Sequence, residues 1–326
     1  MSMQYTAFIS WLKSLSLEIL SITYNLFKLM IPIIIIVKII EELGGIEFIG
    51  IVLAPIMEIV GLPASMGLVW ATTLISNIYG GMIIYVTMAI EQPLTVAQVT
   101  VLGAMMLYAH ALPIELRIAQ KAGVRVLYLF LLRVVGALLL GFLLHQLYSL
   151  GGYLDTPSTA LFKPEVSTDS SLMGWAILQV ETLFKVFLVI IVLVIFLRLL
   201  KLSGIEKLMS WLLKPVLKVL GLSERTTSIT IVGITLGIVY GGSLLINEAK
   251  SGRVTKMDVF GSLTLLALCH SIIEDTLLIM LLGADITGAL YFRVLFALLL
   301  TAILVRLTNI LSEKTINRFL IYPEKT

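Results

Sequence analysis

Long apolar stretches dominate this chain, and short segments rich in charged residues, glycine and proline separate them. Four stretches, at residues 17–40, 124–147, 183–200 and 291–311, are almost uniformly apolar. Two less uniform ones lie at residues 96–118 and 259–282. A helix needs about 20 apolar residues to cross a bilayer, so the pattern predicts six membrane-crossing helices.

A set of short motifs, most of them containing polar residues, glycine or proline, occurs twice along the chain, at offsets of 157 to 161 residues. The order of the matches is constant, which indicates a duplication. The predicted halves are residues 1–150 and 173–326, joined by a polar linker at 151–172. The matched pairs are Leu26-Phe27-Lys28 with Leu183-Phe184-Lys185, Gly45-Ile46-Glu47 with Gly204-Ile205-Glu206, Pro55 with Pro215, Tyr79-Gly80-Gly81 with Tyr240-Gly241-Gly242, His110 with His270, and Arg133 with Arg293.

Each half also contains a short amphipathic segment, at residues 46–60 and 205–219. In the second segment Lys207, Lys214 and Lys218 are spaced by 7 and 11 residues when counted from Lys207, which places them on one face of a helix. This pattern favours a helix lying in the membrane interface, with Trp211 at headgroup depth. A short crossing helix and a solvent-facing loop are the alternatives.

Corresponding loops of the two halves carry opposite charges. The loop between the last two helices is basic in the first half, whereas its counterpart holds only Asp285. The loop after the glycine-containing stretch holds Glu91 in the first half and is basic in the second. The basic residues of these loops are Arg117, Lys121, Arg125, Lys250, Arg253 and Lys256. Positive residues favour the cytoplasmic side, so the two halves are expected to have opposite orientations.

Opposite orientations require an odd number of crossings in each half. Three crossings result if the glycine-containing stretches, at residues 64–90 and 225–249, enter and leave the membrane by the same side. The predicted fold is therefore all-α and integral to the membrane, with two inverted repeats. Each repeat has three transmembrane helices, an interfacial helix and a re-entrant helical hairpin. Both termini are expected in the cytoplasm, and the protein in the plasma membrane.

Composition supports a membrane protein and excludes several other classes. Hydrophobic residues make up 59% of the 326 positions and charged residues 13%, and the mean hydropathy is +1.06, whereas soluble domains are about 25% charged. A net charge of +3 gives no reason to expect nucleic acid as a partner. The single cysteine, Cys269, excludes an internal disulfide and a multi-cysteine metal site. No catalytic motif is present, so we expect no enzyme and no cofactor.

The segment 53–60, the two Tyr-Gly-Gly motifs and the run His-Ser-Ile-Ile-Glu-Asp-Thr-Leu at residues 270–277 resemble the nucleoside-recognition or Gate domain family. That family is shared in part by concentrative nucleoside transporters, the membrane part of ferrous-iron transporter B and spore-maturation membrane proteins. By architecture the resemblance covers nearly the whole chain, and it implies a transport core. The sequence contains neither the scaffold helices of a nucleoside transporter nor the cysteines and GTPase domain of the iron transporter, so the resemblance names no substrate.

The expected hairpin tips are the first candidate site. Their glycine pairs are expected to reverse the chain within the membrane, and the half-helix ends there to bind polar groups or ions. Packing of the glycines between helices is the alternative interpretation. The tip residues predicted to bind substrate are Ser76, Asn77, Tyr79, Gly80, Gly81, Tyr240, Gly241, Gly242 and Ser243.

The helices after the hairpins carry the second candidate site, which is ionisable. Pro113 is expected to open the first helix beside His110, because it cannot donate to the carbonyl of Ala109. Ionisable groups at membrane depth line a pathway by default. They are predicted to bind substrate, a proton or a metal ion, and a structural clasp between the halves is the alternative. These residues are His110, Glu115, His270, Glu274 and Asp275.

Two arginines follow the histidines, at equivalent places in the two halves. Arg133 is expected to extend toward the cytoplasm. Arg293 is expected to pair with an acid, either Asp285 or Asp275. Both arginines are interpreted as structural rather than as substrate ligands.

The leading hypothesis is a secondary transporter of a small polar solute, such as a nucleoside or nucleobase, coupled to Na⁺ or H⁺. The solute would bind at the membrane midplane between the hairpin tips. A divalent-metal transporter is one alternative, and a non-transporting subunit of a membrane complex is another. The expected partners are membrane lipid and a small molecule or ion. A homo-oligomer is also expected, because six crossings offer little scaffold.

Overall fold

The computed structural model describes residues 2–43, 45–89, 92–160 and 171–323, and every named element within these ranges is helical. Isolated β-bridges join Thr95 to Pro157 and Val124 to Ile321. The first half contains α1 (Ser2–Glu42), α2 (Gly45–Ile59), α3 (Met66–Ile75), α4 (Ile78–Met88), α5 (Val96–Tyr108), α6 (Leu112–Lys121) and α7 (Val126–Gly151). The second contains α8 (Leu172–Leu202), α9 (Ile205–Val219), α10 (Glu224–Leu236), α11 (Ile238–Lys250), α12 (Lys256–Leu268), α13 (Glu274–Leu281), the π-helical turn η1 (Thr287–Phe292), α14 (Arg293–Thr308) and α15 (Glu313–Phe319).

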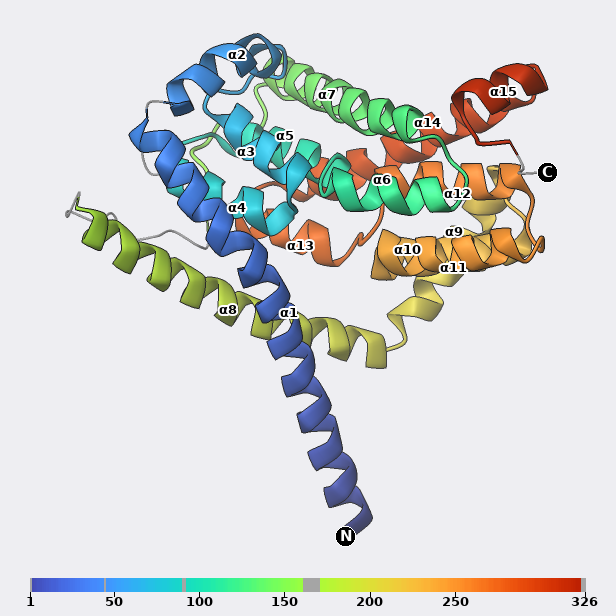
Figure 1. Cartoon of the computed structure of the whole chain (residues 1–326), viewed down its shortest axis with the longest axis horizontal. Coiled ribbons are helices and arrows are strands. Elements are labelled where there is room, and N and C mark those ends of the chain that lie inside the picture. The colour runs from blue at the N-terminus through green and yellow to red at the C-terminus, as the bar shows by residue number, and fades with distance from the viewer. Residues whose placement is uncertain (1, 44, 90–91, 161–170, 324–326) are drawn as a thin grey trace.

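The elements of the two halves follow one another in the same order. A long helix is followed by a short one, then by a pair of packed helices, then by a broken helix and a final long helix. The short amphipathic segments predicted at residues 46–60 and 205–219 are the helices α2 and α9. In Figure 1, α10 and α11 lie side by side at the end of the bundle that carries α15, whereas α3 and α4 lie at the other end, where α3 packs against α2 and α4 against α1.

Four helices in the described ranges are long and apolar enough to cross a membrane: Val96–Lys121, Val126–Gly151, Leu172–Phe196 and Thr287–Thr308. The predicted crossing at residues 17–40 lies within α1, which continues through Pro32. The predicted crossings at 96–118 and 259–282 each consist of two helices, α5 with α6 and α12 with α13, because the chain breaks between them. The outward faces of α7 and α14 are apolar and exposed, for example at Leu127 and Ile303, which suits contact with lipid.

The core of the bundle lies around the broken helices. Nearly every residue of α5 and α12 is buried, and these helices pack against α7, α14 and each other. The first hairpin packs on α5 through α3 and α4, and the second packs on α12 through α10 and α11. The middle of the molecule is therefore built from two broken helices, one from each half.

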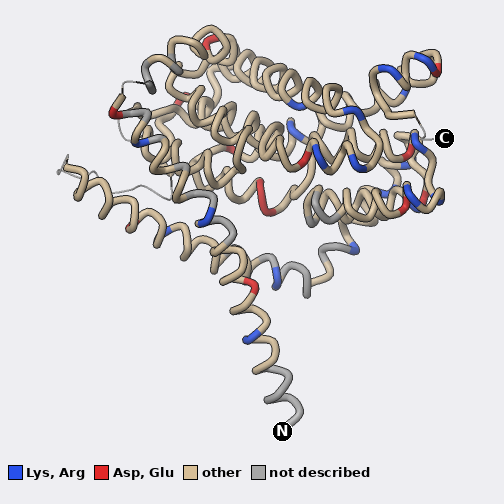
Figure 2. The backbone as a smooth tube through the Cα atoms, in the orientation of Figure 1, with Lys and Arg blue, Asp and Glu red and all other residues tan. Residues whose placement is uncertain are grey.

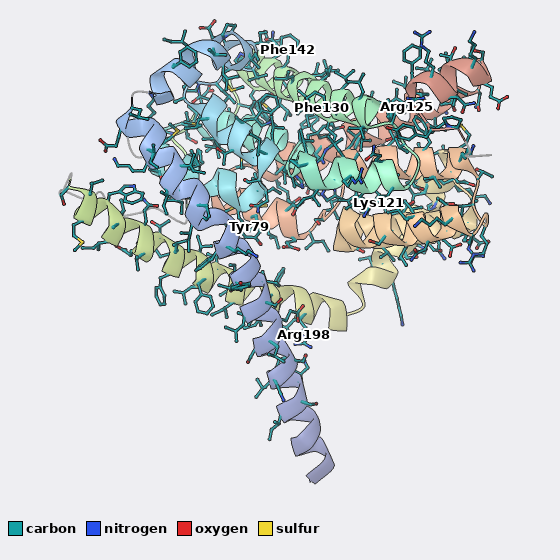
Figure 3. The ribbon with its side chains drawn as sticks, viewed as in Figure 1. Tyr79, Lys121, Arg125, Phe130, Phe142 and Arg198 are labelled. Carbon is teal, nitrogen blue, oxygen red and sulfur yellow. The ribbon has the colours of Figure 1, made fainter. Side chains whose placement is uncertain are left out.

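Basic residues gather at one end of the bundle. Figure 2 shows most of them near α15, the end of α6 and the connection between α11 and α12. This distribution agrees with the alternating charge of the loops, while the side of the membrane that this end faces stays a prediction. Away from the bundle, α1 and α8 cross each other, and Arg198 of α8 contacts the ring of Trp11 at 5.3 Å from its centroid (Figure 3).

Candidate functional site

Both broken helices open at their histidine. In the first half, α5 ends at Tyr108, and the backbone leaves the helical region at Ala109 (φ −142°). In the second half, α12 ends at Leu268, and Cys269 has almost the same conformation (φ −150°). The residue after each histidine has a positive φ, 47° at Ala111 and 45° at Ser271. The two halves thus present a histidine from the same local fold.

A backbone hydrogen bond to the neighbouring hairpin holds each break in place. The amide of Ala111 donates to the carbonyl of Thr73 at 3.1 Å, and the amide of Ile272 donates to the carbonyl of Ile234 at 2.9 Å. The opening predicted beside His110 is confirmed. The second break contains no proline, so proline is not required for this conformation.

Replacing Ala111 with glycine is expected to raise the free energy of unfolding by about 1 kcal/mol, because a left-handed backbone is strained for a residue with a β-carbon. Thermal unfolding of the purified protein in detergent measures this. The matched control is Ala119→Gly within α6, where the backbone is helical and glycine is expected to destabilise by about 1 kcal/mol. A lower melting temperature for Ala111→Gly would contradict the assignment of strain.

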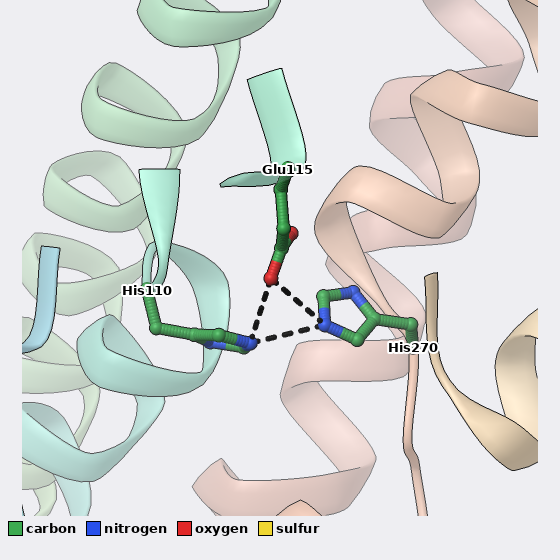
Figure 4. A group of neighbouring side chains, drawn as sticks. All are labelled: His110, Glu115 and His270. Atoms are coloured by element: carbon green, nitrogen blue, oxygen red, sulfur yellow. Dashed lines mark hydrogen bonds and ion pairs between the residues drawn. The ribbon is translucent and has the colours of Figure 1, made fainter. Parts of the chain in front are cut away.

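The two histidines meet at the centre of the bundle (Figure 4). The Nε2 atoms of His110 and His270 are 3.0 Å apart. The Nδ1 atom of His110 lies 3.0 Å from the carbonyl oxygen of Met106, and that of His270 lies 2.7 Å from the carbonyl oxygen of Leu266. A carbonyl oxygen only accepts hydrogen bonds, so each Nδ1 carries a proton. In the neutral rings both Nε2 atoms therefore keep their lone pairs.

Glu115 completes a triangle with the two rings. Its Oε1 atom lies 3.3 Å from Nε2 of His110 and 3.5 Å from Nε2 of His270. Its other oxygen, Oε2, accepts a hydrogen bond from Nη1 of Arg133, which also donates through Nε to the carbonyl of Tyr108 at 3.1 Å. Glu115 is 3% exposed and Arg133 is fully buried. The prediction that Arg133 extends toward the cytoplasm is therefore wrong, because this arginine forms an ion pair in the core.

Three acceptor atoms thus converge without a donor between them when both rings are neutral. Such an arrangement requires a positive charge, either a proton shared by the rings or a metal ion. The three atoms, contributed by His110, Glu115 and His270, lie within 4.8 Å of one another. A tetrahedral zinc ion with bonds of about 2.0–2.1 Å places its ligand atoms about 3.3 Å apart. The observed separations of 3.0, 3.3 and 3.5 Å fit such an ion.

The other two predicted acids lie outside this triangle. Glu274 accepts a hydrogen bond from the hydroxyl of Tyr79 at 3.3 Å, which links α13 to α4. Asp275 is 8% exposed, and its Oδ2 atom has no hydrogen-bond partner. Arg293 donates to the carbonyl of His270 at 2.8 Å, and no ion pair joins it to an acid in the part of the chain that the structure describes. The predicted pairing of Arg293 with Asp285 or Asp275 is therefore wrong.

The chain does not reverse at the glycine pairs, so that prediction is wrong. The reversal occurs at Asn77, whose backbone is extended, and at Gly237, whose φ is 97°. The side chain of Asn77 accepts a hydrogen bond from the amide of Gly80 at 2.9 Å and so caps α4. Ser76 donates to the carbonyl of Thr72 at 2.7 Å. These tip residues therefore have partners within their own hairpin.

The glycines themselves lie inside α4 and α11, at close helix contacts. A β-carbon on Gly81 would meet Thr73 and Met106, and one on Gly242 would meet Ile118. The packing interpretation of the glycine pairs therefore has direct support. Ser243 is exposed, and the side chain of Tyr240 lies outside the described residues.

Two contacts of the site were not predicted from the sequence. They are the hydrogen bonds from the histidine Nδ1 atoms to backbone carbonyls and the ion pair of Arg133 with Glu115. The repeat held a signal for the acceptors, because Met106 and Leu266 are 160 residues apart, as His110 and His270 are. No pattern in the sequence shows that the equivalent histidines touch each other.

Comparisons with known proteins bear on the class of this protein. No family model matches the sequence, and no solved structure matches it. The chain is similar to the uncharacterized membrane protein YvoD of Bacillus subtilis (strain 168), with 26% identity over 290 residues, which cover 86% of this chain and 89% of YvoD. Together with the apolar helices, this similarity identifies the chain as an all-α membrane protein. The resemblance to the Gate family stays a prediction.

Proposed function

We propose that this protein carries a divalent transition-metal cation across the membrane and binds it between its two halves, at His110, Glu115 and His270. The observation that carries the proposal is the convergence of three acceptor atoms within 4.8 Å, contributed by both halves. Imidazole nitrogen with one carboxylate suits ions such as Zn²⁺, Fe²⁺ or Ni²⁺.

Groups around the triangle support a cation rather than a neutral ligand. Both rings are oriented by a hydrogen bond from Nδ1 to a backbone carbonyl, which is the usual support of a metal-binding histidine. Counted in their ionised forms, three carboxylates and two guanidiniums surround the centre. They are Glu115, Glu274, Asp275, Arg133 and Arg293. Of these groups, Glu115 brings a carboxylate oxygen to both rings, where negative charge favours a bound cation.

The architecture supports transport rather than storage of the ion. Broken helices at the centre of a membrane bundle are a recurring feature of secondary transporters, in which inverted repeats move against each other around a central site. In this proposal the halves are inverted, both termini are cytoplasmic, and the ion is exposed to each side in turn. The resemblance to the membrane part of ferrous-iron transporter B is consistent with a metal cargo.

The distance between the rings favours a second candidate function. Nitrogen atoms 3.0 Å apart also suit a hydrogen bond with one proton shared between His110 and His270. In that case the pair is a proton-coupling site of a transporter for a small polar solute, such as a nucleoside or nucleobase. Glu115 would then stabilise the shared positive charge through its Oε1 atom.

Metal binding by the purified protein distinguishes the two functions. We expect one Zn²⁺ or Co²⁺ per chain by calorimetry in detergent, and uptake of the same ion into proteoliposomes loaded with a metal-sensitive dye. Loss of a partner that only orients a metal ligand costs about 10–100-fold in affinity. His110→Ala and His270→Ala remove a ligand, so we expect each to weaken binding by at least about 100-fold.

The matched control is His145→Ala, which removes the third histidine of the chain. His145 lies on α7 against Gly61, outside the triangle, so binding and uptake are expected to stay at the wild-type level. Wild-type protein that binds no Zn²⁺, Co²⁺ or Fe²⁺ would refute the metal proposal. Stabilisation by a nucleoside together with pH-driven uptake that requires His110 would establish the second function instead.

A further inference from the structure

The two halves carry the same set of charged residues at the same spacing, but they use it differently. In each half an acid follows the histidine by 5 residues and an arginine follows it by 23. In the first half the set is assembled, because Arg133 binds Glu115 and Glu115 reaches both rings. In the second half the set is open, because Arg293 binds a backbone carbonyl. One molecule thus shows two arrangements of one motif.

The open set leaves buried polar atoms without partners. The Nε and Nη1 atoms of Arg293 and the Oδ2 atom of Asp275 have no hydrogen-bond partner, although Arg293 is fully buried and Asp275 is 8% exposed. Each buried group left unsatisfied costs about 1–3 kcal/mol, and more when it is charged. An arrangement in which Arg293 binds Asp275 reduces these costs, as in the first half, where Arg133 binds Glu115 and only its Nη2 atom lacks a partner.

The charged groups that act on Asp275 come from both halves. They are Arg293, Glu274, Glu115 and Arg133. Glu274 is held by Tyr79 of the first hairpin, so Asp275 is the acid of the second half that remains available to the histidines. Asp275 occupies the position in the second half that Glu115 occupies in the first, and Glu115 contacts both Nε2 atoms.

The two acids lie on helices that leave the centre in opposite directions. Glu115 is on α6, which leads to the end where Val124 pairs with Ile321 of the C-terminal segment. Asp275 is on α13, which leads to the end where Ser158 donates to the carbonyl of Leu282 at 3.4 Å. Figure 1 shows α6 and α13 extending toward opposite ends of the bundle. Each acid therefore lies in the first turn of a helix that runs from the histidines toward one end of the bundle.

We infer that Asp275 provides a second binding position for the same cation, which it takes over as Glu115 releases it. This inference rests on the proposed cation transport. His110 and His270 stay with the ion in both positions, while the acid changes from that of one half to that of the other. The π-helical turn η1 directly precedes Arg293, whereas Arg133 lies within a regular α-helix. Rewinding of this turn is a local change that brings Arg293 to Asp275.

Binding at equilibrium and transport respond differently to the two acids. Glu115→Gln is expected to weaken binding of Co²⁺ by at least about tenfold in detergent. Asp275→Asn is expected to leave this affinity within about threefold of wild type, because Asp275 does not contact the site in the arrangement observed, yet to lower uptake into proteoliposomes by at least about tenfold. Asp285→Asn is the control for an acid of the second half outside the charged centre, because Asp285 accepts its hydrogen bonds from Thr287. Its affinity and uptake are expected to stay close to wild type.

Two further readouts test the inference: uptake by Asp275→Glu and the melting temperature of Asp275→Asn. Asp275→Glu retains the carboxylate and is expected to recover part of the uptake, whereas a purely structural defect in Asp275→Asn would lower its melting temperature. Wild-type uptake by Asp275→Asn would overturn the inference but leave the proposed function intact. Equal loss of affinity in Glu115→Gln and Asp275→Asn would also overturn it, because both acids would then bind the ion together. Failure of the wild-type protein to bind Co²⁺ would instead refute the proposed function.

Discussion

Replacing Arg133 with methionine is expected to lower the free energy of unfolding by about 3–5 kcal/mol, because it leaves the carboxylate of Glu115 buried without its cationic partner. Arg133 is fully buried and Glu115 is 3% exposed, so water does not replace the lost hydrogen bond. Denaturation of the purified protein in detergent measures the change.

The second half supplies the matched control for this prediction. Arg293 is equally buried but forms no ion pair with the equivalent acid, Asp275, among the described residues. Arg293→Met is therefore expected to cost clearly less than Arg133→Met. The double variant Arg133→Met/Glu115→Leu removes both charges and is expected to regain most of the stability. Equal losses in the two single variants would contradict the asymmetry between the halves.

Replacing Gly241 with alanine is expected to destabilise the protein by about 3 kcal/mol, because the added methyl group has no space. Its β-carbon would lie 2.5 Å from the Cα atom and 2.9 Å from the amide nitrogen of Gly233. These are backbone atoms, so α10 and α11 must move apart to accept it. The yield of folded protein and its melting temperature in detergent both report the effect.

The equivalent glycine of the first half is the control for this substitution. A β-carbon on Gly80 would meet mainly the side chain of Ser76, which can rotate away. Gly80→Ala is therefore expected to stay within about 1 kcal/mol of wild type, since alanine is the better helix former. A large loss at both positions would indicate that the glycines are needed for something other than close packing.

Much of the helical organisation could be predicted from the sequence. The short helices α2 and α9 match the segments predicted from charge and apolar spacing, because such a face depends on local periodicity alone. The break after α12 could not be predicted in this way. Residues 269–273 contain neither glycine nor proline, and the break depends on a hydrogen bond from Ile272 to Ile234, which lies in another helix.

The candidate site was predictable in its members but not in its contacts. The repeat identified His110, Glu115, His270 and Asp275 as equivalent ionisable positions. It could not show that Arg133 binds its acid while Arg293 does not, because the two sequences have the same spacing. The local backbone also differs, because a π-helical turn directly precedes Arg293 whereas Arg133 lies within a regular α-helix.

The contact between His110 and His270 has a consequence for the ancestry of this protein. Two equivalent residues of a duplicated chain touch each other only where the axis relating the duplicates passes between them. If the halves are inverted repeats, as predicted, a single separate half has one such histidine and forms the pair only with a second copy in the opposite orientation. Under the predicted duplication, glutamate at 115 against aspartate at 275 is a difference that the two copies acquired after they were joined in one chain.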